Sequence, residues 1–168
     1  MTAVPPGLAL IAAAAVLPFL AVTARRAVLL AAPLVTLVLV WQVGDGPGPA
    51  VPLLGHALVP VAGSALGRLF ATVFAVMAFG GALYGLTTAG TAELSAAFVY
   101  AGAAIGVSLA GDLVTLAVFW EVMAAASTVV IWGGGTAAAR AAGLRYLMVH
   151  LMGGALLMAG VAMHAGAT

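Results

Sequence analysis

Long runs of apolar residues without charge dominate this sequence and decide what the chain can fold into. Of its 168 residues, 65% are hydrophobic and only 5% are charged. A soluble domain carries about 25% charged residues, because its surface has to face water. This chain has too few charges to form such a surface, so the sequence predicts an integral membrane protein.

The apolar runs predict six membrane-spanning helices in a single transmembrane domain that covers residues 1–168. Backbone polar groups in lipid need partners within their own segment, and no ten-residue alternation of apolar and polar residues suggests a β-barrel. The predicted fold class is therefore all-α, a polytopic membrane helix bundle. A spanning helix needs roughly 20 apolar residues. The predicted spans are residues 7–23, 27–43, 68–86, 93–109, 112–132 and 138–163.

Residues 44–67 interrupt the pattern of apolar runs. Four prolines and several glycines fall within this segment, and they break helices. We expect an extended or hairpin excursion at the membrane surface. The other turns are short, which favours antiparallel neighbours packed as a bundle.

The positions of the charged residues predict an orientation in the membrane. Arg25 and Arg26 lie between the first two spans and Arg140 lies between the last two, so with six spans these turns share one side. Asp45 and Asp112 fall on the opposite side. The positive-inside rule then places the arginines in the cytoplasm and both termini outside. We expect a multi-pass protein of the cell's inner (cytoplasmic) membrane, surrounded by the lipid bilayer.

Glu121 is the most informative residue of the sequence. It lies nine residues after Asp112 and eleven before Trp132, which places it near the middle of the hydrocarbon. An ionised carboxylate at that depth costs about 3 kcal/mol or more, so the side chain should face the bundle interior, pair with a cation or stay protonated. Each outcome makes Glu121 a candidate for handling protons. The alternative is a hydrogen bond between helices without a functional role.

Two residues of the sixth predicted span are candidate partners of Glu121. Counted from the turn before that span, Glu121 lies about 16 Å deep, Arg145 about 12 Å and His150 about 20 Å. The three can therefore meet at one level, where Arg145 could keep the carboxylate ionised and His150 could exchange protons near neutral pH. Alternatively, Arg145 extends to the membrane interface and His150 is a neutral histidine bonded to a carbonyl.

Several other function classes find no support in the sequence. No cluster of Lys and Arg suggests nucleic-acid binding. His56 has no cysteine or group of acids beside it, so no metal site and no cofactor are predicted. No constellation of nucleophile and base suggests an enzyme.

Asp112, which follows a glycine, is predicted to cap the fifth helix, and Glu93 is predicted to lie at the start of the fourth.

The residues around Glu121 resemble a known membrane family. The string GDLVTLAVFWEVM at residues 111–123, followed by LRYL at residues 144–147, is similar to the proton-conducting antiporter-like subunits shared by respiratory complex I and the Mrp-type cation/proton antiporters, most closely the D-type subunit of the Mrp antiporters. In that family, a segment of the form G-D-L-x-x-L-x-V-F-x-E precedes an L-K/R-Y-L segment. Residues 69–74, LFATVF, also resemble the third span of the family.

The resemblance implies a role in ion translocation, since the fifth-span Glu of the family is a functional acid paired with a Lys on a later, broken helix. By position, Glu121 takes this role and Arg145 matches the basic residue of the sixth span, whereas His150 has no firm counterpart. Family members have about fourteen spans in two inverted repeats, and this chain would supply six of them. We therefore expect partner membrane subunits in a multi-subunit complex, including one that supplies the Lys-bearing helices.

Three interpretations stay open. In the first, the chain is a short or split antiporter-like subunit that contributes the fifth-span Glu to proton and monovalent-cation translocation. In the second, it is a non-conducting structural or assembly subunit of a multi-subunit membrane complex. In the third, it oligomerises into a small channel or carrier around the level of Glu121.

Overall fold

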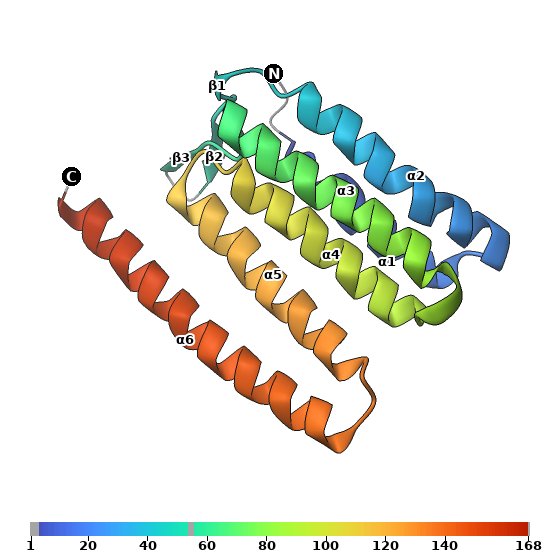
Figure 1. Cartoon of the computed structure of the whole chain (residues 1–168). Helices are drawn as coiled ribbons and strands as arrows, with labels where there is room; N and C mark the ends of the chain where they lie inside the picture. The colour runs from blue at the N-terminus through green and yellow to red at the C-terminus, as the bar shows by residue number, and fades with distance from the viewer. Residues whose placement is uncertain (1–3, 54–55, 168) are drawn as a thin grey trace.

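The computed structural model describes residues 4–53 and 56–167, and in these ranges the chain forms a bundle of α-helices joined by short turns (Figure 1). The helices are α1 (Leu8–Val16), α2 (Val22–Trp41), α3 (Ala65–Thr88), α4 (Thr91–Ser108), α5 (Leu113–Trp132) and α6 (Ala137–Ala167). Helices α2 to α6 are each long and apolar enough to cross a membrane. This confirms the helical bundle and indicates a multi-pass membrane protein.

The first predicted span, residues 7–23, is not one spanning helix. Helix α1 has only 9 residues and runs into a 3-10 turn, η1 (Leu17–Phe19), after which Leu20 is extended with φ −91° and ψ 143°. Pro18 explains the break, because its ring and its missing N–H prevent a regular helix from continuing. Helix α2 accordingly begins at Val22 rather than at the predicted residue 27, so that Arg25 lies in its first turn.

Residues between α2 and α3 form two nested β-hairpins where the sequence predicts an extended or hairpin excursion. The location of this segment at the membrane surface stays a prediction. The outer pair joins β1 (Gly46–Pro47) to β4 (Ala62–Gly63), and the inner pair joins β2 (Val51–Leu53) to β3 (His56–Leu58). Both pairs are antiparallel. The excursion therefore satisfies part of its own backbone, as a segment without helix must do near lipid.

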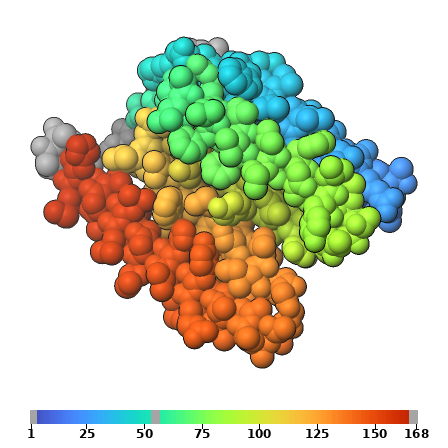
Figure 2. All heavy atoms as spheres, in the orientation of Figure 1, coloured from blue at the N-terminus to red at the C-terminus, as the bar shows by residue number. Residues whose placement is uncertain are grey.

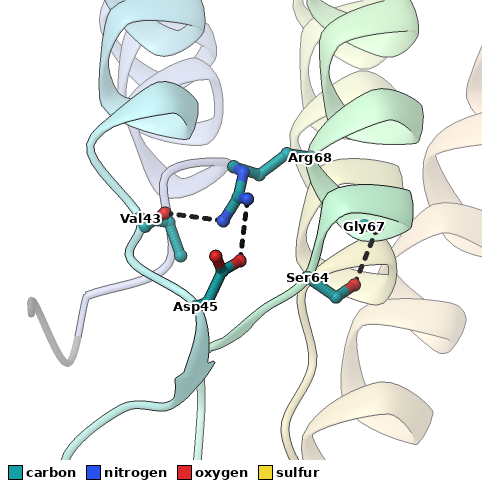
Figure 3. Close-up of polar contacts among 5 residues, drawn as sticks. All are labelled: Val43, Asp45, Ser64, Gly67 and Arg68. Atoms are coloured by element: carbon teal, nitrogen blue, oxygen red, sulfur yellow. Dashed lines mark hydrogen bonds and ion pairs between the residues drawn. The ribbon is translucent and has the colours of Figure 1, made fainter.

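The start of α3 is fixed by a cap and by an ion pair (Figure 3). Ser64 Oγ accepts a hydrogen bond of 3.0 Å from the backbone N–H of Gly67, so α3 begins at Ala65 rather than at the predicted residue 68. Arg68 then reaches back to the end of α2. Its Nη2 lies 2.7 Å from Asp45 Oδ1, and its Nη1 donates to the carbonyl of Val43 at 3.1 Å.

Asp112 caps α5, as predicted, and also fastens the hairpins to the turn between α4 and α5. Its Oδ1 accepts the backbone N–H of Thr115 at 2.7 Å, and its Oδ2 accepts the Thr115 hydroxyl at 2.8 Å. The same Oδ2 accepts the backbone N–H of Val59 at 2.8 Å. The backbone N–H of Gly111 completes the link by donating to the Val59 carbonyl at 3.0 Å.

Helix α4 is the centre of the bundle and α6 is its outermost helix. Half of the most apolar stretch of α4 is buried, against 6% of that of α6. Helix α1 crosses α4 so closely that a Cβ on Gly7 or Gly102 would overlap the backbone of the other. Phe98 and Ile105 of α4 are almost fully buried. Helix α6 packs mainly against α5, and Figure 1 shows it along the edge of the bundle.

The excursion lies at the same end of the bundle as both ends of the chain (Figure 1). The α1–α2 and α5–α6 turns, with Arg26 and Arg140 near them, lie at the opposite end. Which end faces the cytoplasm stays a prediction.

Candidate functional site

Helix α5 presents Glu121 to α6. Glu121 is the ninth of the 20 residues of α5, so it lies near the middle of the helix as counted from the sequence. Its side chain is half-buried, and a Cβ built on Gly154 of α6 would overlap its carboxyl group. The carboxyl group therefore lies directly against the α6 backbone, at a point where only glycine leaves room for it. We call this contact region between α5 and α6 the seam.

The Glu121 carboxyl has no partner within residues 4–53 and 56–167. No hydrogen bond or ion pair in this part of the chain reaches it. Within hydrocarbon, an unpaired carboxylate costs about 3 kcal/mol or more. An ionised Glu121 at that depth would therefore need a compensating charge from outside the described residues.

His150 lies in the same seam, between two aromatic rings. Its ring centroid is 5.3 Å from that of Trp120 on α5 and 5.6 Å from that of Tyr146, one turn earlier on α6. Its Nε2 atom is buried and has no hydrogen-bond partner in the described part of the chain. His150 precedes Gly154 by one helical turn, about 6 Å along the axis. Nε2 therefore keeps an unused hydrogen-bonding position inside the seam.

Arg145 does not meet Glu121 in this structure. It is exposed, and it precedes Gly154 by nine residues, which is about 13 Å along the axis of α6. The sequence-based depth count failed because it placed the start of α6 level with the end of α5. Instead, Trp132 Nε1 donates to the Arg140 carbonyl at 3.3 Å, so α6 begins further down and Arg145 lies near the end of the seam.

Three residues that shape this site were not predicted from the sequence. Gly154 lets the carboxyl approach α6, and Trp120 and Tyr146 enclose the His150 ring. The signal for Gly154 was present, because residues four apart share one face of a helix and Gly154 follows His150 by four. Among the described residues, no group of three or more His, Asp or Glu side chains could hold a metal ion.

Comparison of the chain with known protein families, with curated proteins and with solved structures finds no match. The fold identifies the chain by class, as a multi-pass helical membrane protein. The likeness to the antiporter-like subunits depends on residues 69–74, 111–123 and 144–147, and membership of that family stays a prediction.

Proposed function

We propose that this chain is a membrane subunit of a larger complex that translocates protons and monovalent cations, and that Glu121 is its proton-carrying acid. The observation that supports the proposal is the Glu121 carboxyl in an apolar seam, pressed against Gly154, with no compensating group in the described part of the chain. The resemblance of residues 111–123 to the antiporter-like subunits points to the same role.

The seam offers a simple way to couple the two ions. Protonated Glu121 is neutral and is tolerated between apolar helices, whereas the ionised form needs a positive charge nearby. Arrival of a cation would release the proton, and departure of the cation would recover it. His150 Nε2, buried and without a partner among the described residues, would accept or return that proton.

The positive charge would come from a partner subunit. Arg145 does not reach Glu121, so the described chain does not itself supply the basic group. Helix α6 offers a broad apolar surface for such a partner, with Val149 at 67% and Met152 at 64% exposure. We propose that partner membrane subunits cover this surface and that one of them brings a Lys-bearing helix to the seam. The proposed location is the cytoplasmic membrane, with both termini outside.

Replacing the acid with its amide tests the proposal. The complex, purified with its associated chains, is reconstituted into vesicles, and cation-dependent proton flux is followed with a pH-sensitive dye. Glu121→Gln should lower the flux by at least about tenfold, because the amide binds no proton. Asp45→Asn is the matched control, since it makes the same change at a side chain that is 77% exposed at the end of the bundle. Unchanged flux in Glu121→Gln would refute the proposal.

Arg145 lies away from Glu121, and this separation favours a second candidate function. Without an Arg145–Glu121 pair, the chain could serve as a structural or assembly subunit whose exposed α6 holds other subunits together. In that case, bulky replacements on the outer face of α6, Val149→Trp with Met152→Trp, should release the associated membrane chains during purification. Normal flux in Glu121→Gln together with this loss of partners would establish the structural role.

A further inference from the structure

A groove of about 700 Å³ runs over α4, between α3 and α5. It exists because α3 and α5 each pack against α4 but hardly against each other. In the view of Figure 2, the green spheres of α3 and the orange spheres of α5 lie on either side of α4. The volume falls within the range of about 300–1,000 Å³ that is typical of small-molecule sites.

The groove has one apolar end and one polar end. Small side chains make room for it: Ala78, Gly81, Ala82 and Gly85 of α3, and Ala97 and Ala101 of α4. Phe74 and Met77 line the end near the middle of the bundle, whereas Thr88 and Glu93 line the end beside the α3–α4 turn. From Phe74 to Thr88 the groove follows about 21 Å of α3. Half of the hydrocarbon core measures about 15 Å, so the groove can hold a chain from one leaflet.

The polar end of the groove carries a carboxylate that this chain leaves without a partner. Glu93 is half-buried, and no hydrogen bond or ion pair reaches it from the described residues. Arg25, the nearby cation, is already engaged, since its Nη1 donates to Thr91 Oγ1 at 2.7 Å and its Nη2 to the Leu20 carbonyl at 3.1 Å. Tyr84 also lines the groove, and both a carboxylate and an aromatic ring favour an ammonium group.

We propose that this groove binds a membrane lipid whose headgroup carries a cationic amine. The amine would lie at Glu93, and an acyl chain would lie over the alanines of α4. Charge complementarity selects the headgroup, because Glu93 attracts an ammonium group and repels an anionic one. We expect the ligand to be a lipid, because the apolar end of the groove opens among helices that can span a membrane. This site is separate from the seam and independent of proton translocation.

Two neighbouring glycines of α3 provide a matched pair of variants. A Cβ on Gly80 or on Gly81 meets no atom within 4 Å, so both helix positions accept a larger side chain. Gly81 lines the groove and Gly80 does not. Gly81→Leu should therefore fill the groove, while Gly80→Leu makes the same change in helix propensity and leaves the groove open. Glu93→Gln removes the charge alone.

The full chain, purified in detergent with its associated subunits, is mixed with dioleoyl phosphatidylethanolamine or with dioleoyl phosphatidylglycerol, which have the same acyl chains. Retained lipid is measured by native mass spectrometry, and the melting temperature of each variant without lipid reports folding. The unaltered chain should retain the ethanolamine lipid about tenfold better than the glycerol lipid. A preference of this size is expected from a single charge interaction at the membrane interface. Glu93→Gln should lose this preference, Gly81→Leu should retain neither lipid, and Gly80→Leu should behave as the unaltered chain.

Several outcomes would overturn the proposal. Equal retention of both lipids, or a preference that survives in Glu93→Gln, would remove the role of the carboxylate. Equal loss of lipid in Gly80→Leu and Gly81→Leu would show that the groove is not the site. Binding of dodecylamine without any binding of the ethanolamine lipid would assign the groove to free amphipathic amines instead. A polypeptide cross-linked at Ala97 in the assembled complex would assign it to a protein helix.

Discussion

At the hairpin end of the bundle, charged side chains find partners within the chain, whereas in the seam between α5 and α6 they do not. Asp112 accepts three hydrogen bonds, and Arg68 pairs with Asp45. Glu121 and Arg145 have no such contact among the described residues. Water can solvate an unpaired charge at the end of a bundle but not in its middle. A chain built only for stability would therefore pair the charges in the middle first. The difference leaves Glu121 without a compensating charge among the described residues, which is the position that the proposed partner subunit would fill.

Helices α4 and α6 also differ, in how much of their surface is buried. Helix α4 is buried over half of its most apolar stretch and α6 over 6%. Tight packing fixes side chains, while a helix held mainly by one neighbour can shift and admit a partner. Two groups without a partner among the described residues, Glu121 and His150 Nε2, therefore lie on or against the helix with the least buried surface.

The largest expected effect contrasts the two helices by side-chain removal. Phe98→Ala in α4, at a side chain 1% exposed, should lower the free energy of unfolding by about 3–5 kcal/mol, because it leaves a cavity. Leu156→Ala in α6, at 69% exposure, should lower it by less than about 0.5 kcal/mol. Denaturant titration in mixed micelles measures both. Similar losses of unfolding free energy in the two variants would contradict the difference in packing between α4 and α6.

Asp112→Ala should have the next largest effect. It removes the cap of α5 and the bond to Val59, and it leaves their backbone N–H groups unsatisfied. We expect a loss of about 2–3 kcal/mol and faster proteolysis of the excursion. Asp112→Asn, which keeps an accepting oxygen, is the control and should lose less. Slow proteolysis in Asp112→Ala would show that other contacts hold the hairpins.

Gly154→Ala should strain the seam. Its Cβ would overlap the Glu121 carboxyl, so one helix must move at a cost of about 1–2 kcal/mol. Gly153→Ala is the matched control, because a Cβ there meets nothing within 4 Å and alanine favours helix. Double-mutant analysis with Glu121→Gln sharpens the test: the amide should not relieve the strain, whereas Glu121→Ala should. Equal stability of the two glycine variants would place Glu121 away from α6.

The smallest expected effect is on the stability of Glu121→Gln. Since no partner within the described chain is lost and the size is kept, the free energy of unfolding should stay within about 0.5 kcal/mol. The variant thus separates the function of the acid from the fold. A loss of several kcal/mol would reveal a structural hydrogen bond and favour the assembly role.

Local signals explain what the sequence predicted correctly. The cap at Asp112 depends on a residue and its own next turn, and the position of Glu121 near the middle of its helix depends on counting along one helix. The break in the first span was also local, because Pro18 is visible in the sequence, but the apolar run outweighed it in the prediction. The prolines and glycines of the excursion likewise predicted the hairpins.

The facing of α5 and α6 could not be predicted in this way. It depends on the turn between them, where Gly135 adopts φ +70° and Trp132 bonds to Arg140 across the turn. Arg145 and Gly154 lie nine residues apart on α6, so the register set by this turn decides which of them lies level with Glu121. The link from Val59 to Asp112 joins residues 53 apart and was equally hidden from local patterns.

The attachment of α6 mainly to one neighbouring helix has a consequence for biogenesis. Translation delivers the helices to the membrane in order, and α1 to α5 can pack around α4 before α6 arrives, because α6 contacts chiefly α5. During that interval the Glu121 face of α5 stands open in the bilayer.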